Sequence, residues 1–232
     1  MAAEAVAGDR WVTFDCYGTL VDWWTGMGDA AASVAGERAA ELLDAYHEQE
    51  LILEAERPAH SYRHVLTEGL RRAAARRGIE LPGAGDQAFV RAWTQMPVFD
   101  DVGPALAALS GAGWRLAILT NCDDDLFAGT ARHLPAEFHV VVTAEQVGSY
   151  KPDLGHFHAF RERAGVGEGE WVHAACSWMH DILPAARLGI PRVWVDRDRS
   201  GHPPGIADVV LPDMVGLPDA VEQAAALRAP RA

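Results

Sequence analysis

The side chains best suited to group transfer stand where apolar stretches of the sequence end. Asp15 follows the apolar run 11–14, and Thr120 and Asn121 follow the run 114–119. Lys151 and Asp181 stand at the starts of later helical stretches. Asp15 can act as a nucleophile that forms a covalent ester, while Lys151 favours its ionised form. Asp181 can pair with the lysine, position water or bind a metal, and Thr120 and Asn121 can donate hydrogen bonds to a substrate anion or leaving group.

Lys151 is the single lysine of the chain, and the rest of the 20 basic residues are arginines. A sequence that uses arginine as its general surface cation has retained an ammonium group at this one position. Lysine differs from arginine in presenting a compact point charge instead of a planar fork. This count indicates a functional lysine, whereas Thr120, Asn121 and Asp181 also fit the simpler roles of turn or helix-capping residues.

The residues between these motifs predict alternating strands and helices. Apolar runs predict strands at 11–14, 114–119, 138–142, 171–175, 192–195 and 209–211, and helical spacing predicts helices at 102–112, 154–164, 182–188 and 217–227. The segment 22–96 contains no strand-like run, and its helical pattern over 29–77 is interrupted at Pro58. We therefore expect an α/β fold, with a Rossmann-like parallel sheet core at 1–21 and 97–232 and an inserted helical cap at 22–96. The carboxyl ends of parallel strands would bring the polar residues to one edge.

Four motifs in this order resemble the haloacid dehalogenase (HAD) superfamily of hydrolases. They are Phe14-Asp15-Cys16-Tyr17-Gly18-Thr19-Leu20, Leu119-Thr120-Asn121, Tyr150-Lys151-Pro152, and Ser177 with Asp181 before 185–190. The resemblance spans the chain and implies catalytic roles for Asp15, Thr120, Lys151 and Asp181. It also implies a substrate site lined by Tyr17, Thr19, Asn121, Ser177, Trp178 and Phe157.

Tyr17 distinguishes two branches of this superfamily. The phosphatases carry an aspartate two residues after the nucleophile, which protonates the leaving alkoxide, and here that position is Tyr17. The motif resembles instead the 2-haloacid dehalogenases, which attack carbon and use no metal. Cys176 replaces a carboxylate that phosphatases use for Mg²⁺. We expect no cofactor; a phosphatase would need Mg²⁺, for which Asp15 and Asp181 are the available ligands.

Other positions depart from the dehalogenases. Those enzymes carry serine and asparagine where this chain has Cys176 and Trp178, and tyrosine where it has Phe157. Their cap arginine has no clear equivalent, and Arg57 and Arg63 are the nearest candidates. The expected reaction is attack on carbon of a small, anionic carboxylic acid. The alternatives are a Mg²⁺-dependent phosphatase, a hydrolase that opens a strained ring, and a binding protein without catalysis.

Composition excludes several other classes. The formal charge of −13 argues against nucleic-acid binding, and no apolar run is long enough to span a membrane. Three cysteines do not form a disulfide framework, which favours the reducing cytoplasm. The resemblance implies that this protein can form a homodimer, as is common for proteins of this fold. The run Asp123-Asp124-Asp125 is expected to cap the following helix, with metal binding as the alternative.

Overall fold

The computed structural model describes residues 10–167 and 170–227. Its centre is a sheet of six parallel strands in the order β3-β2-β1-β4-β5-β6. The strands are β1 (Arg10–Phe14), β2 (Trp114–Thr120), β3 (Val140–Thr143), β4 (Trp171–Ala175), β5 (Arg192–Val195) and β6 (Val209–Leu211). The predicted α/β class with a Rossmann-like core is confirmed.

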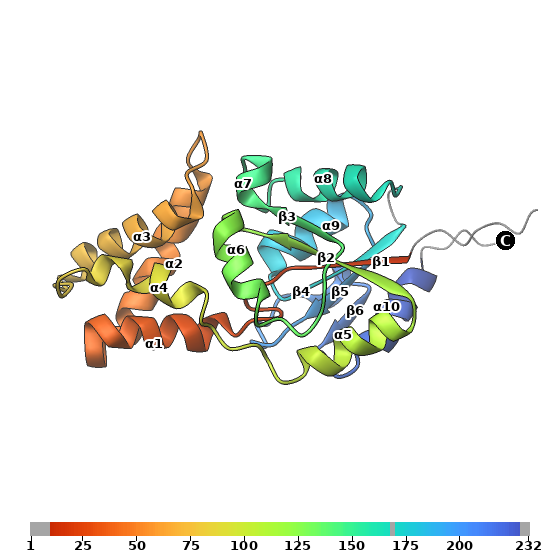
Figure 1. Cartoon of the computed structure of the whole chain (residues 1–232), viewed down its shortest axis with the longest axis horizontal. Helices are drawn as coiled ribbons and strands as arrows, with labels where there is room; N and C mark the ends of the chain where they lie inside the picture. Colours follow the sequence, from red (N-terminus) through yellow and green to blue (C-terminus); the bar gives the residue numbers. More distant parts are fainter. Residues whose placement is uncertain (1–9, 168–169, 228–232) are drawn as a thin grey trace, which may run out of the picture.

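Helices cover both faces of the sheet, as parallel strands that are apolar on both sides require (Figure 1). On one face lie α7 (Ala144–Val147), α8 (Gly155–Ala164) and α9 (Leu183–Arg187); on the other lie α5 (Val102–Gly111) and α10 (Leu217–Ala226). The helix α6 (Asp124–Ala131) lies between the sheet and the cap. In β1, Trp11 packs in the cluster under α8, whereas Val12 and Phe14 belong to the larger cluster on the opposite face.

The segment between β1 and α5 forms a separate group of helices (Figure 1). These are α1 (Trp23–Ala35), α2 (Ala39–Ala55), α3 (Tyr62–Arg77) and α4 (Ala88–Trp93), and we call them the cap. The first begins earlier than the helical spacing predicted, because the Asp22 carboxylate accepts a hydrogen bond from Thr25 N and caps it. Short 3-10 turns lie at 36–38, 85–87 and 204–206.

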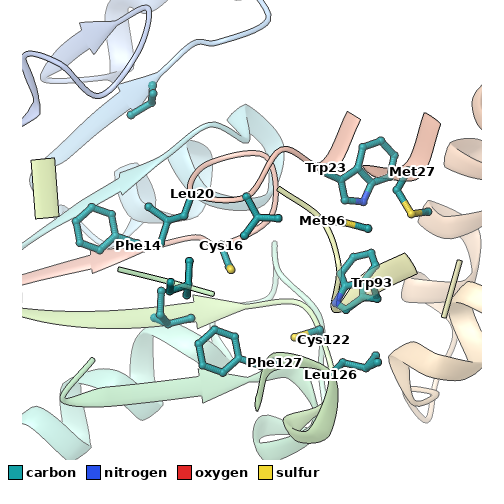
Figure 2. Packing of buried hydrophobic residues seen from close by; sticks show 14 of the residues in the cluster. Phe14, Cys16, Leu20, Trp23, Met27, Trp93, Met96, Cys122, Leu126 and Phe127 are labelled. Carbon is teal, nitrogen blue, oxygen red and sulfur yellow. The ribbon is translucent and has the colours of Figure 1, made fainter. Parts of the chain in front are cut away.

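The two chain segments that join cap and core pair with each other. Val21 and Val98 form an antiparallel bridge, Asp22 N donates to Pro97 O at 2.8 Å, and Phe99 N donates to Leu20 O at 3.1 Å. We call this paired segment the neck. Buried side chains continue across it: Figure 2 shows Trp23, Met27, Trp93 and Met96 of the cap side in the same cluster as Phe14, Cys16 and Leu20.

Two local differences from the predicted elements have clear causes. The expected helix at 182–188 is found as α9. A π-helical turn that the spacing did not predict (Trp178–Ile182) precedes it, and the Ser177 Oγ accepts from His180 N at the start of that turn. Such turns are rare and often occur at functional sites. The expected strand 138–142 is found at Val140–Thr143, where it aligns with Ala117–Thr120 of β2. No helix of the described residues is both long and apolar enough to cross a membrane.

Candidate active site

The ammonium group of Lys151 lies at the centre of the polar network at the carboxyl ends of the strands. Its Nζ contacts Asp15 Oδ1 at 2.9 Å, Asp181 Oδ1 at 2.7 Å and the Leu119 carbonyl at 2.8 Å. Three acceptors match the three N–H donors of an ammonium. Burial alone would lower the pKa of Lys151, but the charges of Asp15 and Asp181 outweigh that and raise it above its usual value. The lysine is therefore held in its charged form.

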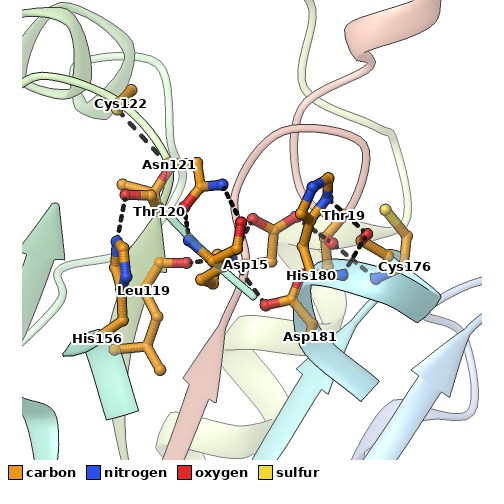
Figure 3. A network of polar contacts seen from close by, with 12 residues as sticks. Asp15, Thr19, Leu119, Thr120, Asn121, Cys122, His156, Cys176, His180 and Asp181 are labelled. Atoms are coloured by element: carbon orange, nitrogen blue, oxygen red, sulfur yellow. Dashed lines mark hydrogen bonds and ion pairs between the residues drawn. The ribbon is translucent and has the colours of Figure 1, made fainter. Parts of the chain in front are cut away.

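Asp15 lies one residue beyond β1, an inner strand that pairs with β2 on one side and β4 on the other. Burial raises the pKa of its carboxyl, and the Lys151 ammonium and Thr19 hydroxyl act in the opposite direction. Thr19 Oγ1 donates to Asp15 Oδ2 at 2.9 Å and accepts from Cys176 N at 2.9 Å (Figure 3). Gly18, at φ +87°, makes the turn that brings Thr19 back to Asp15, and a Cβ there would lie 2.9 Å from Cys176 Sγ.

Asp181 is completely buried and its carboxylate is held by two donors. Besides Lys151, His173 Nε2 lies 3.0 Å from Asp181 Oδ1, and His173 Nδ1 lies 2.9 Å from Thr13 Oγ1. Burial would raise the pKa of Asp181, but the Lys151 charge and the His173 hydrogen bond lower it to about 2. Its Oδ2 has no hydrogen-bond partner among the described residues. His173 was not identified from the sequence because it lies inside an apolar strand pattern.

Asn121 fixes the backbone from which Lys151 projects. Its Oδ1 accepts from Lys151 N at 2.7 Å, and its Nδ2 donates to Lys151 O at 3.0 Å. His156 Nε2 lies 3.1 Å from the Thr120 carbonyl, which anchors α8 to the end of β2. The predicted residue Asn121 thus positions the lysine and also lines the cavity described next.

A cavity of about 330 Å³ opens between the cap and this network. Of the predicted residues, Asp15, Tyr17, Asn121, Lys151, Ser177, Trp178 and Asp181 line it. From the cap it is lined by Trp23, Trp24, His47, Glu50, Tyr62 and Trp93, and from the loop after β5 by Asp196, Arg197, Asp198, Ser200 and His202.

Three predicted residues lie outside the cavity wall of the described residues. Phe157 is fully buried in the hydrophobic cluster under α8, against the ring of His173 at 5.1 Å, because it occupies the apolar face of that helix. Thr120 is also fully buried, with its Oγ1 3.7 Å from Cys122 Sγ, and it does not line the cavity of the described residues. Thr19 contributes through Asp15 and not through the cavity wall. Neither Phe157 nor Thr120 therefore reaches the cavity wall where contact with substrate was expected.

The acidic run and the two arginines have structural roles. The Asp123 carboxylate accepts from Tyr62 N at 2.6 Å and Arg63 N at 2.9 Å, so it caps α3 and makes no capping bond to α6. Asp124 and Asp125 lie in the first turn of α6, where carboxylates were expected. Arg63 also pairs with Asp125. Arg57 pairs with Asp153 at 2.5 Å. Neither arginine lines the cavity of the described residues.

Two carboxylates of the cap approach the network and were not identified from the sequence. Glu50 lines the cavity, and Glu54 Oε1 lies 3.4 Å from Asn121 Nδ2. Burial raises the pKa of Glu54 well above its usual range, and the neighbouring Glu50 charge acts in the same direction. A signal was available, because both glutamates share helical spacing with the buried Tyr46 and Leu53.

The site offers a poor set of ligands for Mg²⁺. The two carboxylates that would be available, Asp15 and Asp181, are bridged by Lys151, and Cys176 supplies a soft thiol where a carboxylate would be needed. The described residues contain no group of three or more His, Cys, Asp or Glu arranged to hold a metal ion.

Comparisons with known proteins give relatives with both phosphatase and dehalogenase names. The chain is 30% identical over 135 residues to a phosphoserine phosphatase of Thermus thermophilus, covering 55% of this chain and about half, 53%, of that relative. It is 23% identical over 193 residues to an (S)-2-haloacid dehalogenase of Pseudomonas sp. strain YL, covering 80% and 82% of the two chains.

Solved structures share the fold along nearly the whole chain. The L-2-haloacid dehalogenase of Xanthobacter autotrophicus superposes with a TM-score of 0.79 at 20% identity, covering 93% of this chain and 99% of that one. A HAD phosphatase from Thermococcus onnurineus gives 0.61 at 20% identity, covering 90% and 96%. The family model of the haloacid dehalogenase-like hydrolases matches residues 10–176, and the chain therefore belongs to that family.

Proposed function

We propose that this hydrolase attacks a carbon atom of its substrate with Asp15 and uses no metal in that step. The observation that carries the proposal is the place of Lys151, whose Nζ lies within 2.9 Å of Asp15 and 2.7 Å of Asp181. An ammonium group lies between these two carboxylates and donates to both. It favours the ionised form of the nucleophilic carboxylate without adding a Lewis acid for a phosphoryl group.

The reaction has two steps. An Asp15 oxygen forms a bond to the substrate carbon while the bond to the leaving group breaks, and the leaving group departs with the electron pair. Water then adds to the carbonyl carbon of the aspartyl ester, which releases an alcohol and a proton and restores the carboxylate. We assign the orientation of this water to Asp181, which shares the Lys151 ammonium with Asp15. The low pKa of Asp181, about 2, suits orientation better than proton abstraction.

The substrate class follows from the leaving group and from the relatives. Tyr17 occupies the sequence position at which a phosphatase carries its proton donor. Its hydroxyl group lies 2.8 Å from Thr130 Oγ1, so it is already hydrogen-bonded within the protein. A leaving group that departs without a proton, such as a halide, fits this arrangement. The resemblance to an (S)-2-haloacid dehalogenase makes a small carboxylic acid with its leaving group on C2 the proposed substrate.

A second candidate is supported by the phosphoserine phosphatase relative, which is 30% identical over 135 residues. In the hydrolysis of a small phosphate ester, Asp15 would attack the phosphorus atom instead of a carbon atom. It would require Mg²⁺ and a proton donor other than Tyr17, and the ligand set described above fits Mg²⁺ poorly.

Halide release in the presence of a chelator tests the proposal. Purified enzyme is offered chloroacetate and each enantiomer of 2-chloropropionate, alongside an Asp15→Asn variant and an Asp153→Asn control at the surface. We expect release by the wild type and the control and none by Asp15→Asn. Repeated turnover in ¹⁸O-water should place the label in the Asp15 carboxylate. Activity on phosphate esters that appears only with added Mg²⁺ would refute the proposal, and hydrolysis of strained-ring acids without halide release would redirect it to ring opening.

A further inference from the structure

The described residues that line the cavity carry an excess of negative charge. Five acidic side chains face two cationic ones, Lys151 and Arg197. Lys151 is shared between two of the acids. Arg197 binds Asp101 through two hydrogen bonds of 2.9 Å, and Asp101 lies outside the lining. In a site enclosed by low-dielectric walls such an excess repels a simple anion and concentrates cations.

Glu50 places part of this charge on the cap side of the cavity. Its Oε1 accepts hydrogen bonds from the hydroxyls of Tyr46 at 3.1 Å and Tyr62 at 2.5 Å. Its Oε2 lies 3.1 Å from His47 Nδ1, and this contact raises the pKa of the imidazole. Three polar partners fix the carboxylate, and its residue remains part of the cavity wall. The dehalogenase resemblance implies an arginine in the cap, whereas here the cap contributes a glutamate.

The cavity walls are aromatic as well as acidic. Trp23, Trp24, Trp93 and Trp178 all line the space, together with Tyr62. Trp23 and Trp24 meet edge to face with their ring centres 4.7 Å apart, and Trp24 Nε1 donates to Asp198 at 3.1 Å. Indole faces attract cations, and aromatic walls with nearby carboxylates are the usual surroundings of a bound ammonium group.

A carboxylate oxygen of Asp181 that lacks a hydrogen-bond donor within the described part of the chain also favours a positively charged ligand. Asp181 lines the cavity and is fully buried, yet its Oδ2 has no hydrogen-bond partner among the described residues. A buried carboxylate oxygen without a donor costs free energy unless a ligand or water supplies one. This unbalanced acceptor adds to the negative potential around the cavity.

We propose that the cavity recognises a positively charged group on the substrate, an alkylammonium held between Glu50 and the tryptophans. This rests on the proposed function for the reacting end: if that end is a 2-substituted carboxylic acid, the whole substrate is a zwitterion of the amino-acid type. The ammonium group takes no part in the bond changes at carbon. It raises the affinity of the enzyme for substrates that carry it.

Binding of unreactive ligands to the wild-type enzyme tests this without turnover. Propylammonium, 1-propanol and propionate have similar size and differ in charge, and the lining tryptophans report occupancy by fluorescence. At about pH 8.5 the alkylammonium remains charged. We expect propylammonium to bind about tenfold more tightly than propionate, the size of one desolvated cation contact.

Charge-neutral variants locate the effect. Glu50→Gln keeps an oxygen for the tyrosine hydroxyls, and we expect it to weaken propylammonium binding about tenfold while sparing 1-propanol. The matched control is Glu48→Gln on the same helix, whose carboxylate is half-exposed beside Arg76. If Glu50→Gln does not fold, Asp198→Asn at the exposed edge of the cavity should weaken the same ligand.

Each outcome decides the matter. Tighter binding of propionate, equal effects of Glu50→Gln and Glu48→Gln, or no saturable propylammonium binding would overturn the proposal. Failure of the proposed function has a different signature, because loss of Asp15-dependent turnover leaves these ligand affinities unchanged.

Discussion

Acid sensitivity of the fold should depend on His156. This imidazole is fully buried on α8, its Nε2 contacts the Thr120 carbonyl at 3.1 Å, and its Nδ1 has no partner among the described residues. Burial is the main reason that its pKa falls to about 3, and the Lys151 charge adds to the effect. The folded state therefore holds the neutral ring well below the pH at which the unfolded chain takes up a proton.

The free-energy cost follows from proton linkage. The group is neutral in both states above the unfolded value of 6.5, so it contributes no pH dependence there. As the pH falls below 6.5, protonation of the unfolded chain destabilises the fold by about 1.4 kcal/mol per unit, until the folded pKa is reached. At about pH 5 the loss is about 2 kcal/mol.

Urea denaturation at about pH 7.5 and about pH 5 measures this loss. In His156→Gln the amide can still donate to the Thr120 carbonyl, and we expect the fall in unfolding free energy to shrink by about 2 kcal/mol relative to wild type. The control His158→Gln lies on the same helix at an exposed position and should fall as the wild type does. An equal fall in all three proteins would refute the reasoning, since the other titrating groups are common to them.

Three further predictions concern the network and the cap. Lys151→Met leaves two buried carboxylates without their cation, so we expect loss of turnover and a destabilisation of about 3–5 kcal/mol in urea denaturation. Thr19→Ala removes the hydroxyl that bonds the candidate nucleophile, and turnover should fall by about 10-fold or more, with recovery in Thr19→Ser. Gly26→Ala would place a Cβ 2.4 Å from Met96 Cγ, which should lower thermal stability by about 1–3 kcal/mol. Gly28→Ala on the same helix meets nothing within 4 Å and should raise stability by about 0.5–1 kcal/mol; equal effects of the two alanines would contradict the packing argument.

The order of elements and the centre of the site could be predicted from the sequence. Short apolar runs that end in polar residues identify parallel strands, and the sheet geometry then brings Asp15, Lys151 and Asp181 together at distances below 3 Å. The single lysine was informative because composition made it exceptional. These signals lie in short stretches of sequence, and the parallel sheet brings the residues that carry them close together.

Residues whose role depends on facing a distant element could not be assigned this way. Phe157 and Thr120 have chemistry compatible with a pocket, but the face of α8 and the pleat of β2 direct both into the interior. Glu50 and His173 carry no motif, and their importance appears once the cap packs over the sheet. Asp123 caps a helix 61 residues earlier in the chain, a partnership that no local pattern predicts.

The neck also bears on how the molecule folds. Strand β1 pairs with β2 across the entire length of the cap, from Arg10 beside Trp114, so closing that loop has a large entropic cost. Because Val21 and Val98 are bridged, a folded cap already holds its two ends together. The helical insertion then shortens the effective separation between the first two strands. Its internal packing should therefore influence the rate at which the central sheet assembles, in addition to shaping the cavity.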